Sequence, residues 1–236
     1  MSEMSTPGLT GISLVEELCL LAIEDDGSVA STAGEPAFGM GVVGACLVEL
    51  CIRGRLDADV RPGEGDAGPQ TILMTLSQEP TGEPALDAAL AYVAAGPVRS
   101  AAEWTHQLFP QAGELVRKAL ERLQTRGVIE AREARFMWVL KTRRYPVLEG
   151  RELQEAKLRI TEVLMGGTIP TPHDSVLIGL ASISGLLRGF LSSAELGRLQ
   201  RRIDEVGSLD LVARGVEDAI HEEIELRARG MMIPIM

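Results

Sequence analysis

Two early stretches of the chain are almost wholly apolar. Residues 14–23 begin within the sequence Ser13-Leu14-Val15-Glu16, a capping box in which the Ser hydroxyl and the Glu carboxylate each satisfy a free amide at a helix start. Residues 40–53 are apolar nearly all round, as is typical of a helix that other helices surround. The pattern therefore predicts two buried helices, with the second at the centre of a bundle.

The middle of the chain mixes short strands with short helices. Residues 61–69 are rich in Gly and Pro and predict a loop between two short strands. Ser100-Ala101-Ala102-Glu103 forms another capping box, and Gly127 suits the left-handed position that ends a helix. We expect the second strand at 71–76 and helices at 84–94, 101–109 and 114–126.

After Gly127 the pattern changes to that of strands. Residues 135–141 alternate between two faces, with Phe136, Trp138 and Leu140 on one of them, and a period of two indicates a strand. We expect a β-hairpin formed by residues 128–131 and 135–141. The remainder of the chain predicts helices at 151–165, 175–190, 193–206 and 209–229.

These elements define a mainly α fold, in which amphipathic helices surround buried central helices, with a β-hairpin and a few short strands. Apolar residues make up 45% of the chain but aromatic residues only 3%, so aliphatic side chains must fill the core, and that mixture favours helices. No long polar linker divides the 236 residues, which suits a single domain. We expect a frayed or disordered N-terminus at 1–12, a helical domain at 13–229 and an apolar tail at 230–236.

The net charge of −11 argues against a protein whose whole surface grips nucleic acid or anionic lipid, since long-range repulsion opposes both. The distribution of charge is uneven, however. Residues 117–144 hold nine basic and three acidic side chains, so this segment carries +6 and the rest of the chain −17. The segment is either a solvated helix face followed by a hairpin with charged edges, or an anion-binding face.

Three cysteines, Cys19, Cys46 and Cys51, lie in apolar runs without metal-ligand spacing. They predict buried free thiols in a reducing compartment. The chain opens with no signal-peptide pattern and contains no run of about 18 uncharged apolar residues. We therefore expect a cytoplasmic protein whose contact with a membrane is peripheral.

Several patterns that suggest chemistry have simpler explanations. Residues 39–44 match G-x-G-x-x-G, but no buried strand precedes them to present the turn to a pyrophosphate. The serines of 181–185 lack the first Gly of a nucleophile elbow. His221 has Glu217 and Glu225 one helical turn to either side, which a solvated acidic helix face explains better than a metal site. We expect no enzyme activity, catalytic residue, metal or cofactor, and the three histidines are expected on the surface.

Two features remain as candidates for binding. A short helix, a longer helix and a hairpin in that order resemble a winged-helix module, whose basic residues contact phosphates. Alternatively, the apolar segment 136–140, flanked by Arg135, Lys141, Arg143 and Arg144, can rest on an anionic interface, where each nearby cation contributes on the order of 1 kcal/mol. A purely structural interpretation has Phe136 and Trp138 packed on the helical body.

Several short stretches, taken in order, resemble the Golgi phosphoprotein 3 family. The match is collinear from about residue 13 to 220, and the order and spacing of the pieces carry the resemblance. The pieces are LVEEL at 14–18 with EDDG at 24–27, LVEL at 47–50 running into RGRL at 53–56, PTGEP at 80–84 with LDAAL at 86–90, RGVI at 126–129, and RYPV at 144–147.

The resemblance implies a mostly helical domain and a hairpin used in self-association. It also implies the activity of the eukaryotic members, which bind phosphatidylinositol 4-phosphate on a basic face and act as adaptors that retain Golgi membrane enzymes. Because the chain lacks an extended basic N-terminal tail, it is more similar to a prokaryotic-type member.

The chain departs from the family at the lipid pocket, which uses a Trp upstream of the second helix and three Arg side chains. No Trp precedes Trp104 here, and the Arg positions hold Val43, Gly113 and Val116. Arg117 and Lys118 are adjacent cations and can partly substitute, since a phosphate requires cationic donors, although Lys lacks the bidentate fork of Arg.

We therefore expect a non-catalytic peripheral-membrane adaptor. An anionic, phosphoinositide-like headgroup would bind at Arg117, Lys118, Arg143 and Arg144, while Phe136, Trp138 and Leu140 would mediate membrane contact or self-association. A protein partner is expected, as is a homo-oligomer formed through the hairpin. The alternatives are a winged-helix-like nucleic-acid-binding protein, which the acidic remainder of the chain opposes, and a structural interaction module whose hairpins pair across a two-fold axis.

Overall fold

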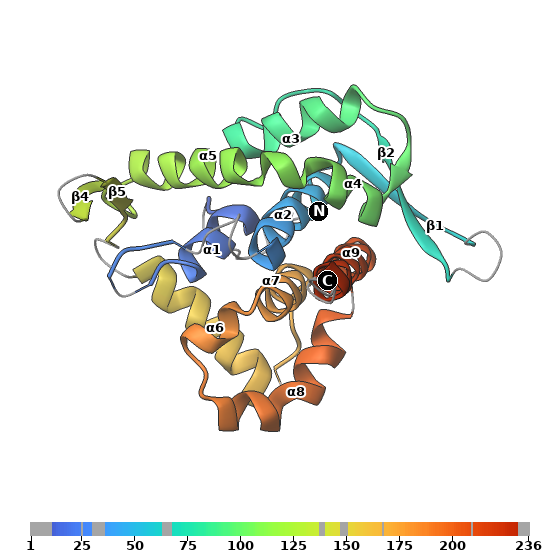
Figure 1. Ribbon diagram of the computed structural model, residues 1–236. Coiled ribbons are helices and arrows are strands. Elements are labelled where there is room, and N and C mark those ends of the chain that lie inside the picture. The colour runs from blue at the N-terminus through green and yellow to red at the C-terminus, as the bar shows by residue number, and fades with distance from the viewer. Residues whose placement is uncertain are drawn as a thin grey trace, which may run out of the picture.

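The computed structural model is mainly helical, and its helices surround one central helix, α2 (Figure 1). It describes residues 11–24, 26–29, 36–62, 68–136, 140–146, 151–166, 168–208 and 210–230, and of these only the backbone at 132–136, 140–143, 211 and 223–230. The α-helices are α1 (Leu14–Leu21), α2 (Pro36–Ile52), α3 (Pro84–Ala94), α4 (Ala101–Leu108), α5 (Ala112–Thr125), α6 (Arg151–Gly166), α7 (Pro172–Ile183), α8 (Ser193–Gly207) and α9 (Leu211–Gly230). The strands are β1 (Leu56–Arg61), β2 (Gln70–Thr75), β3 (Arg99–Ser100), β4 (Arg132–Phe136) and β5 (Leu140–Arg144), and two short 3₁₀ helices are η1 (Phe109–Gln111) and η2 (Leu186–Gly189).

The core forms around α2, as the sequence predicts. Every residue of this helix from Phe38 to Leu50 is buried, and α2 contacts α1, α3, α4, α5, α7 and α9. A helix that is apolar on all sides can satisfy its side chains only when it is enclosed by others. The mainly α prediction is thus confirmed.

The glycines of α2 allow the neighbouring helices to approach closely. A Cβ atom at Gly41 would lie 2.2 Å from Ser184 Oγ beside α7, and one at Gly44 would lie 2.7 Å from Val216 on α9. The G-x-G-x-x-G pattern therefore lies inside a helix and serves packing. It does not form the strand-to-helix turn that a dinucleotide site needs.

A small antiparallel sheet lies beside α4. Strands β1 and β2 pair from Leu56 with Thr75 to Arg61 with Gln70, which confirms the predicted pair of strands around a Gly- and Pro-rich loop. The sequence analysis missed β3, since two residues are too short to show alternation. Ser100 ends β3 and caps α4, and Glu103 completes the predicted capping box.

The predicted strand bounds of the hairpin are wrong. The structure pairs β4 with β5, and Phe136 faces Leu140 across the two strands. Phe136 and Leu140 therefore belong to two different strands, and residues 137–139 of the predicted strand lie outside the described residues. The error has a physical reason: residues 137–139 are Met, Trp and Val, and none of them signals a turn as Gly, Asn, Asp or Pro would.

In the view of Figure 1, α6, α7 and α8 lie below α1 and α2, and α9 lies beside α2. The helix predicted at 175–190 is shorter, because α7 ends at Ile183 and Gly185 adopts a left-handed φ of 74°. The predicted helices at 151–165, 193–206 and 209–229 are present within two residues of these bounds. In the described part of the chain, no helix has the length and apolar character needed to cross a bilayer.

The cysteines are free thiols, as predicted. Cys19 and Cys46 are buried and Cys51 is half-buried. Burial raises the pKa of Cys51 to about 12 and raises the pKa of the other two as well. All three are therefore protonated at neutral pH.

Candidate functional site

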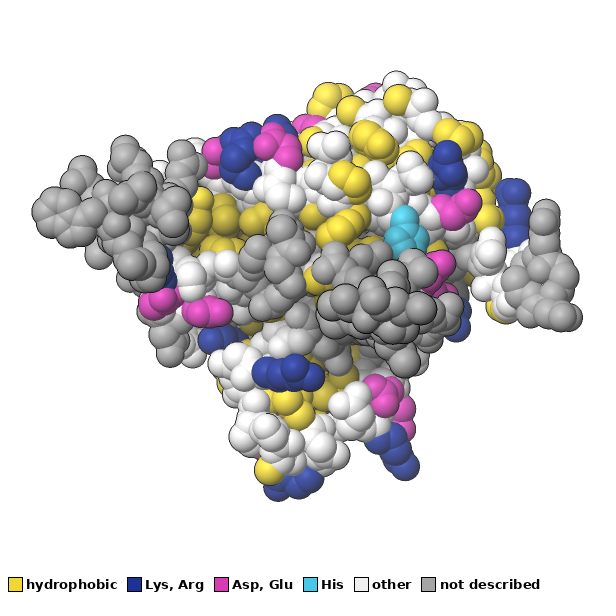
Figure 2. Space-filling model, in the orientation of Figure 1, with side chains coloured by type: hydrophobic (Ala, Val, Ile, Leu, Met, Phe, Trp, Pro, Cys, Tyr) yellow, Lys and Arg dark blue, Asp and Glu magenta, His cyan; other side chains and the backbone are white. Residues whose placement is uncertain are grey.

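The outer face of α5 carries two of the predicted headgroup-binding residues. Arg117 lies 2.5 Å from both Glu114 Oε1 and Glu121 Oε1, and Lys118 Nζ lies 3.6 Å from Glu114. Hydrogen bonds with these carboxylates raise the pKa of Arg117, and the bond from Arg117 lowers the pKa of Glu114. Two cations and two carboxylates thus balance along this face, and Figure 2 shows Lys or Arg and Asp or Glu side chains next to one another over α5.

The inner face of α5 binds buried carboxylates. Arg122 Nη1 lies 2.5 Å from Glu16 Oε2 and 3.5 Å from Glu83 Oε2, and Arg126 Nη1 lies 3.6 Å from Glu16. The Glu16 side chain is only 1% exposed. These two cations of the basic segment therefore compensate buried negative charge, which would otherwise carry a large desolvation cost.

A third arginine completes this network. Arg53 lies 2.8 Å from Glu49 and 2.5 Å from Glu83, and Glu49 also accepts the backbone N–H of Leu14. The network joins α1, α2, α5 and the residue that precedes α3. Its three carboxylates and three guanidinium groups cancel in charge, which is the arrangement expected of a structural ion-pair cluster.

A second network lies where α1, α6 and α7 meet. Arg159 places one nitrogen 3.0 Å from Glu17 Oε2 and another 2.8 Å from Asp174 Oδ1, and His173 Nε2 lies 2.7 Å from Glu17. Burial alone would raise the pKa of Asp174, but hydrogen bonds from Thr171 and Arg159 lower it. The His173 side chain is 32% exposed, and its ring binds a carboxylate that is 2% exposed.

The hairpin is fastened to the helical body at its base. The Tyr145 N–H donates to the Gly27 carbonyl at 2.6 Å, and the Glu130 N–H donates to the Pro146 carbonyl at 3.0 Å. Arg144 forms an ion pair with Asp26. Hydrogen bonds from Ser28, and secondarily from Arg144, lower the pKa of Asp26 to about 2. From this base β4 and β5 project away from the helices, at the left of Figure 1.

The hairpin strands hold all five remaining cations of the basic segment. Among the ten residues of β4 and β5, five are basic and Glu133 is the one acid. Paired positions include Arg135 with Lys141 and Arg132 with Arg144. Like charges directly opposite one another destabilise a strand pair, whereas Glu133 is paired in register with the opposite charge of Arg143.

The structure distributes the predicted site residues over two regions. Arg117 and Lys118 pair with acids of their own helix, whereas Arg144 pairs with Asp26 in the loop after α1. No described contact joins the two groups. Phe136, Leu140 and Arg143 are described by their backbone alone, and Trp138 lies outside the described residues, as do residues 1–10 and 231–236 of the predicted termini.

The winged-helix alternative gains no support from these contacts. A recognition helix presents its cations to phosphates, but Arg117, Lys118, Arg122 and Arg126 on or next to α5 all pair with carboxylates. Over the described residues, no group of three His, Cys, Asp or Glu side chains is arranged to hold a metal ion. Of the serines in residues 181–185, Ser184 is buried and its Oγ donates a hydrogen bond to the Ala37 carbonyl, so it serves packing.

Sequence reasoning missed the buried carboxylates. Glu16 was identified only as a capping residue, a role it does have, since it accepts the Ser13 N–H at 3.0 Å. Glu17 and Glu49 lie within apolar runs, and an acid in a buried helix requires a partner. The acids within apolar runs could therefore have been recognised as buried and paired, but the sequence does not show which cations pair with them.

The positions that match the family's lipid-binding Arg residues are apolar or small here, and two of them belong to the core. Val43 is fully buried on α2 and Val116 is 8% exposed on α5. Buried valines offer no donor to a phosphate. A lipid pocket of the family type is therefore not formed by these side chains.

Comparison with known proteins identifies the chain by family. No curated protein matches it. The family model of Golgi phosphoprotein 3 (GPP34) matches residues 14–223, which extend from the first residue of α1 into α9. The chain therefore belongs to the Golgi phosphoprotein 3 (GPP34) family.

Proposed function

We propose that this protein is a non-catalytic adaptor that docks peripherally on an anionic membrane through the β4–β5 hairpin. Membership of the family supports an adaptor role, since its eukaryotic members act in this way. The observation that carries the proposal is the composition of the hairpin. Its two strands hold five cations and one acid, and in the sequence the apolar segment 136–140 joins them.

The hairpin combines the two properties that interfacial binding requires. Cations near an anionic leaflet each contribute on the order of 1 kcal/mol, and aromatic and aliphatic side chains favour the headgroup boundary. Phe136, Trp138 and Leu140 supply the apolar part, while Lys141, Arg143 and Arg144 follow on β5. In this proposal the headgroups contact Arg143 and Arg144, and the tip enters the interface.

Arg117 and Lys118 have a smaller part in this proposal. Their charges are offset by Glu114 and Glu121, so they add little to long-range attraction. An exposed ion pair is weak and can exchange its partner for a headgroup at short range. The membrane is then the cytoplasmic leaflet, where anionic lipids concentrate.

The apolar tip also suits self-association, because hairpins can pair across a two-fold axis. The same residues would then be covered by a second copy. Membrane binding and pairing compete for one surface, so both must be measured on the same variant.

The test is sedimentation with vesicles of phosphatidylcholine alone, with added phosphatidylserine, or with added phosphatidylinositol 4-phosphate. We expect binding to the anionic vesicles that weakens with salt and falls at least about tenfold in Trp138→Glu. Leu76→Glu is the matched control, since Leu76 is 62% exposed and lies next to β2, and it should bind as the unsubstituted protein does.

Light scattering of the same two variants distinguishes membrane binding from self-association through the apolar segment 136–140. A halved mass in Trp138→Glu alone would indicate pairing through the hairpin. Absence of binding to every anionic vesicle at low salt would refute the membrane proposal. Equal loss in both variants would refute the role of the hairpin.

A further inference from the structure

A hollow of about 560 Å³ opens on the surface between α3 and α4. Its walls are one face of α3, the turn at 96–99 and the middle and end of α4, and its larger side chains are Tyr92, Arg99, Trp104 and Gln107. This volume lies within the range of specific ligand sites. Hydrophobic side chains gather over α3 and the neighbouring turn in Figure 2, and Tyr92 and Val98 are 43% and 59% exposed.

Trp104 forms the rigid base of the hollow. It is 2% exposed, and its ring fits against Gly96 so closely that a Cβ atom there would lie 2.4 Å from Cη2. The Tyr92 ring meets it edge to face, with centroids 6.4 Å apart. The indole Nε1 of Trp104 is buried without a hydrogen-bond partner, which leaves a donor that a bound group can satisfy after a small movement.

Arg99 supplies a cation to the same hollow. Its guanidinium carbon lies 5.7 Å from the centroid of the Trp104 ring, a geometry that holds a cation over the aromatic face. Glu103, the nearest acid along α4, accepts hydrogen bonds from Ser100. Within the described residues no carboxylate lies within ion-pair distance of Arg99. Arg99 therefore offers a guanidinium group at the edge of the hollow that no described carboxylate neutralises.

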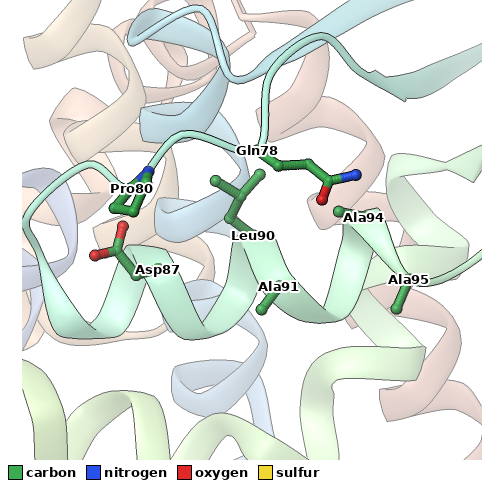
Figure 3. Close-up of a pocket in the computed structure, with 7 residues that line it drawn as sticks. All are labelled: Gln78, Pro80, Asp87, Leu90, Ala91, Ala94 and Ala95. Atoms are coloured by element: carbon green, nitrogen blue, oxygen red, sulfur yellow. The ribbon is translucent and has the colours of Figure 1, made fainter.

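A second hollow, of about 340 Å³, lies on the other side of α3 (Figure 3). Gln78, Pro80 and Asp87 line it, and Ala91 and Ala95 border both hollows. Because alanine side chains are short, the ridge of α3 between the hollows is low. One extended chain can therefore cross Ala91 and Ala95 and occupy both hollows, whereas a small molecule would fill only one.

The charges give such a chain a direction. Arg99 attracts an acid at the α4 end. Asp87, which accepts hydrogen bonds from the N–H and hydroxyl of Thr81, disfavours an acid at the other end. The apolar walls between them suit small aliphatic or proline side chains.

We propose that this surface binds an extended peptide of a protein partner, with an acidic side chain paired to Arg99 beside Trp104 and the following apolar residues laid across Ala91 and Ala95. The bidentate guanidinium suits a carboxylate, and Tyr92 and Gln107 supply further polar contacts. The peptide thus occupies a site that no membrane contact of the hairpin requires.

The two proposals are separable because the two sites are separated. The hollow adjoins α4, which precedes α5, and the hairpin follows α5 (Figure 1). The 14 residues of α5 correspond to about 20 Å at 1.5 Å per residue. Changes in the hollow should therefore leave vesicle binding intact.

The test is fluorescence polarisation with a panel of labelled peptides of about eight residues, long enough to span roughly 25 Å when extended. Each carries one Asp or Glu followed by Leu, Pro or Ala, and each has a matched Asn or Gln version. We expect the acidic versions to bind at least about tenfold more tightly. Arg99→Gln should remove that preference, and Ala91→Leu, which raises the ridge, should weaken binding about tenfold or more. Arg61→Gln, at an exposed arginine on β1, should have no effect.

Intrinsic fluorescence provides a second readout. The chain has two Trp residues, so a Trp138→Phe background leaves Trp104 as the reporter, and its emission should shift when an acidic peptide binds. Equal binding of acidic and amide peptides, or binding unchanged in both Arg99→Gln and Ala91→Leu, would overturn the proposal. So would a panel without binders accompanied by loss of phosphatidylserine-vesicle binding in Arg99→Gln, since the hollow would then be a lipid contact.

Discussion

The cations of α5 and those of the hairpin are close in sequence but differ in what surrounds them. Along α5 and at its end, Arg117, Lys118, Arg122 and Arg126 each lie beside at least one carboxylate. Two of the acids belong to α5 itself, and the others are Glu16 and Glu83. In the hairpin, the two strands carry five cations and one acid, and one of these cations, Arg144, pairs with Asp26 in the loop after α1.

The difference shows that the net charge of a segment is not the charge of a surface. The +6 of residues 117–144 suggests one continuous basic face. Folding brings Glu16 to Arg122 across 106 residues of sequence and thereby converts part of that face into a structural network. By sequence, the other five cations of the segment lie on the hairpin strands. The predictions below compare the two regions in order of expected effect.

The largest effect is expected on the free energy of unfolding, from a change in the buried ion pair between Arg122 and Glu16. Arg122→Met leaves the buried Glu16 without its closest partner, and removing one member of a buried ion pair is strongly destabilising. Because Arg126 still lies 3.6 Å away, we expect a loss of about 3 kcal/mol in the free energy of unfolding, measured with urea at pH 7. Arg117→Met, on the outer face of the same helix, is the control and should change stability little. Equal effects of the two substitutions would erase the distinction between the faces.

A smaller effect is expected on membrane affinity. Lys141→Gln with Arg143→Gln removes two hairpin charges and should weaken sedimentation with phosphatidylserine vesicles by about 2 kcal/mol at low salt, at about 1 kcal/mol per charge. The control is Arg117→Gln with Glu121→Gln, which changes an ion pair on α5 without changing net charge. A large loss of vesicle binding in the control would show that Arg117 contacts headgroups directly and that the outer face of α5 takes part in membrane binding.

The smallest effect concerns pH. The lowered pKa of Asp174 means that its ion pair stabilises the fold above the unfolded carboxyl pKa of about 3.9, and that this stabilisation is lost as pH falls through the folded value. We expect Asp174→Asn to lower the free energy of unfolding by about 1 kcal/mol at pH 7. The gap from the unsubstituted protein should shrink below about pH 4. A gap that is constant with pH would assign the loss to the helix cap and not to the ion pair with Arg159.

Local signals made most of the fold predictable. The helix expected at 84–94 is α3, with the same bounds, because Pro at its first position marks its start. The apolar run of residues 40–53 correctly placed α2 at the centre. The predicted bounds of the hairpin strands were wrong, because the sequence at 137–139 contains none of the residues that signal a turn. The pairing of strands also depends on the whole fold, which local signals do not show.

The site was less predictable than the fold, because it depends on contacts between distant residues. Arg159 and Glu17 are 142 residues apart, and no periodicity links them. The hollow between α3 and α4 was missed for a similar reason. Arg99 looks like any loop cation in the sequence, and its position over Trp104 becomes visible only once the turn at 96–99 is folded.

The joint between the hairpin and the loop after α1 has a mechanical consequence. Gly27 has a φ of 79°, and a Cβ atom there would press within 3.2 Å of the backbone nitrogens of Tyr145 and Pro146. The hairpin is thus a lever with a fixed pivot, held by one short hydrogen bond and one ion pair directly after the first helix. If the hairpin docks as proposed, this joint transmits its orientation to the helical body, and a side chain at Gly27 would disturb the contact with Tyr145 and Pro146.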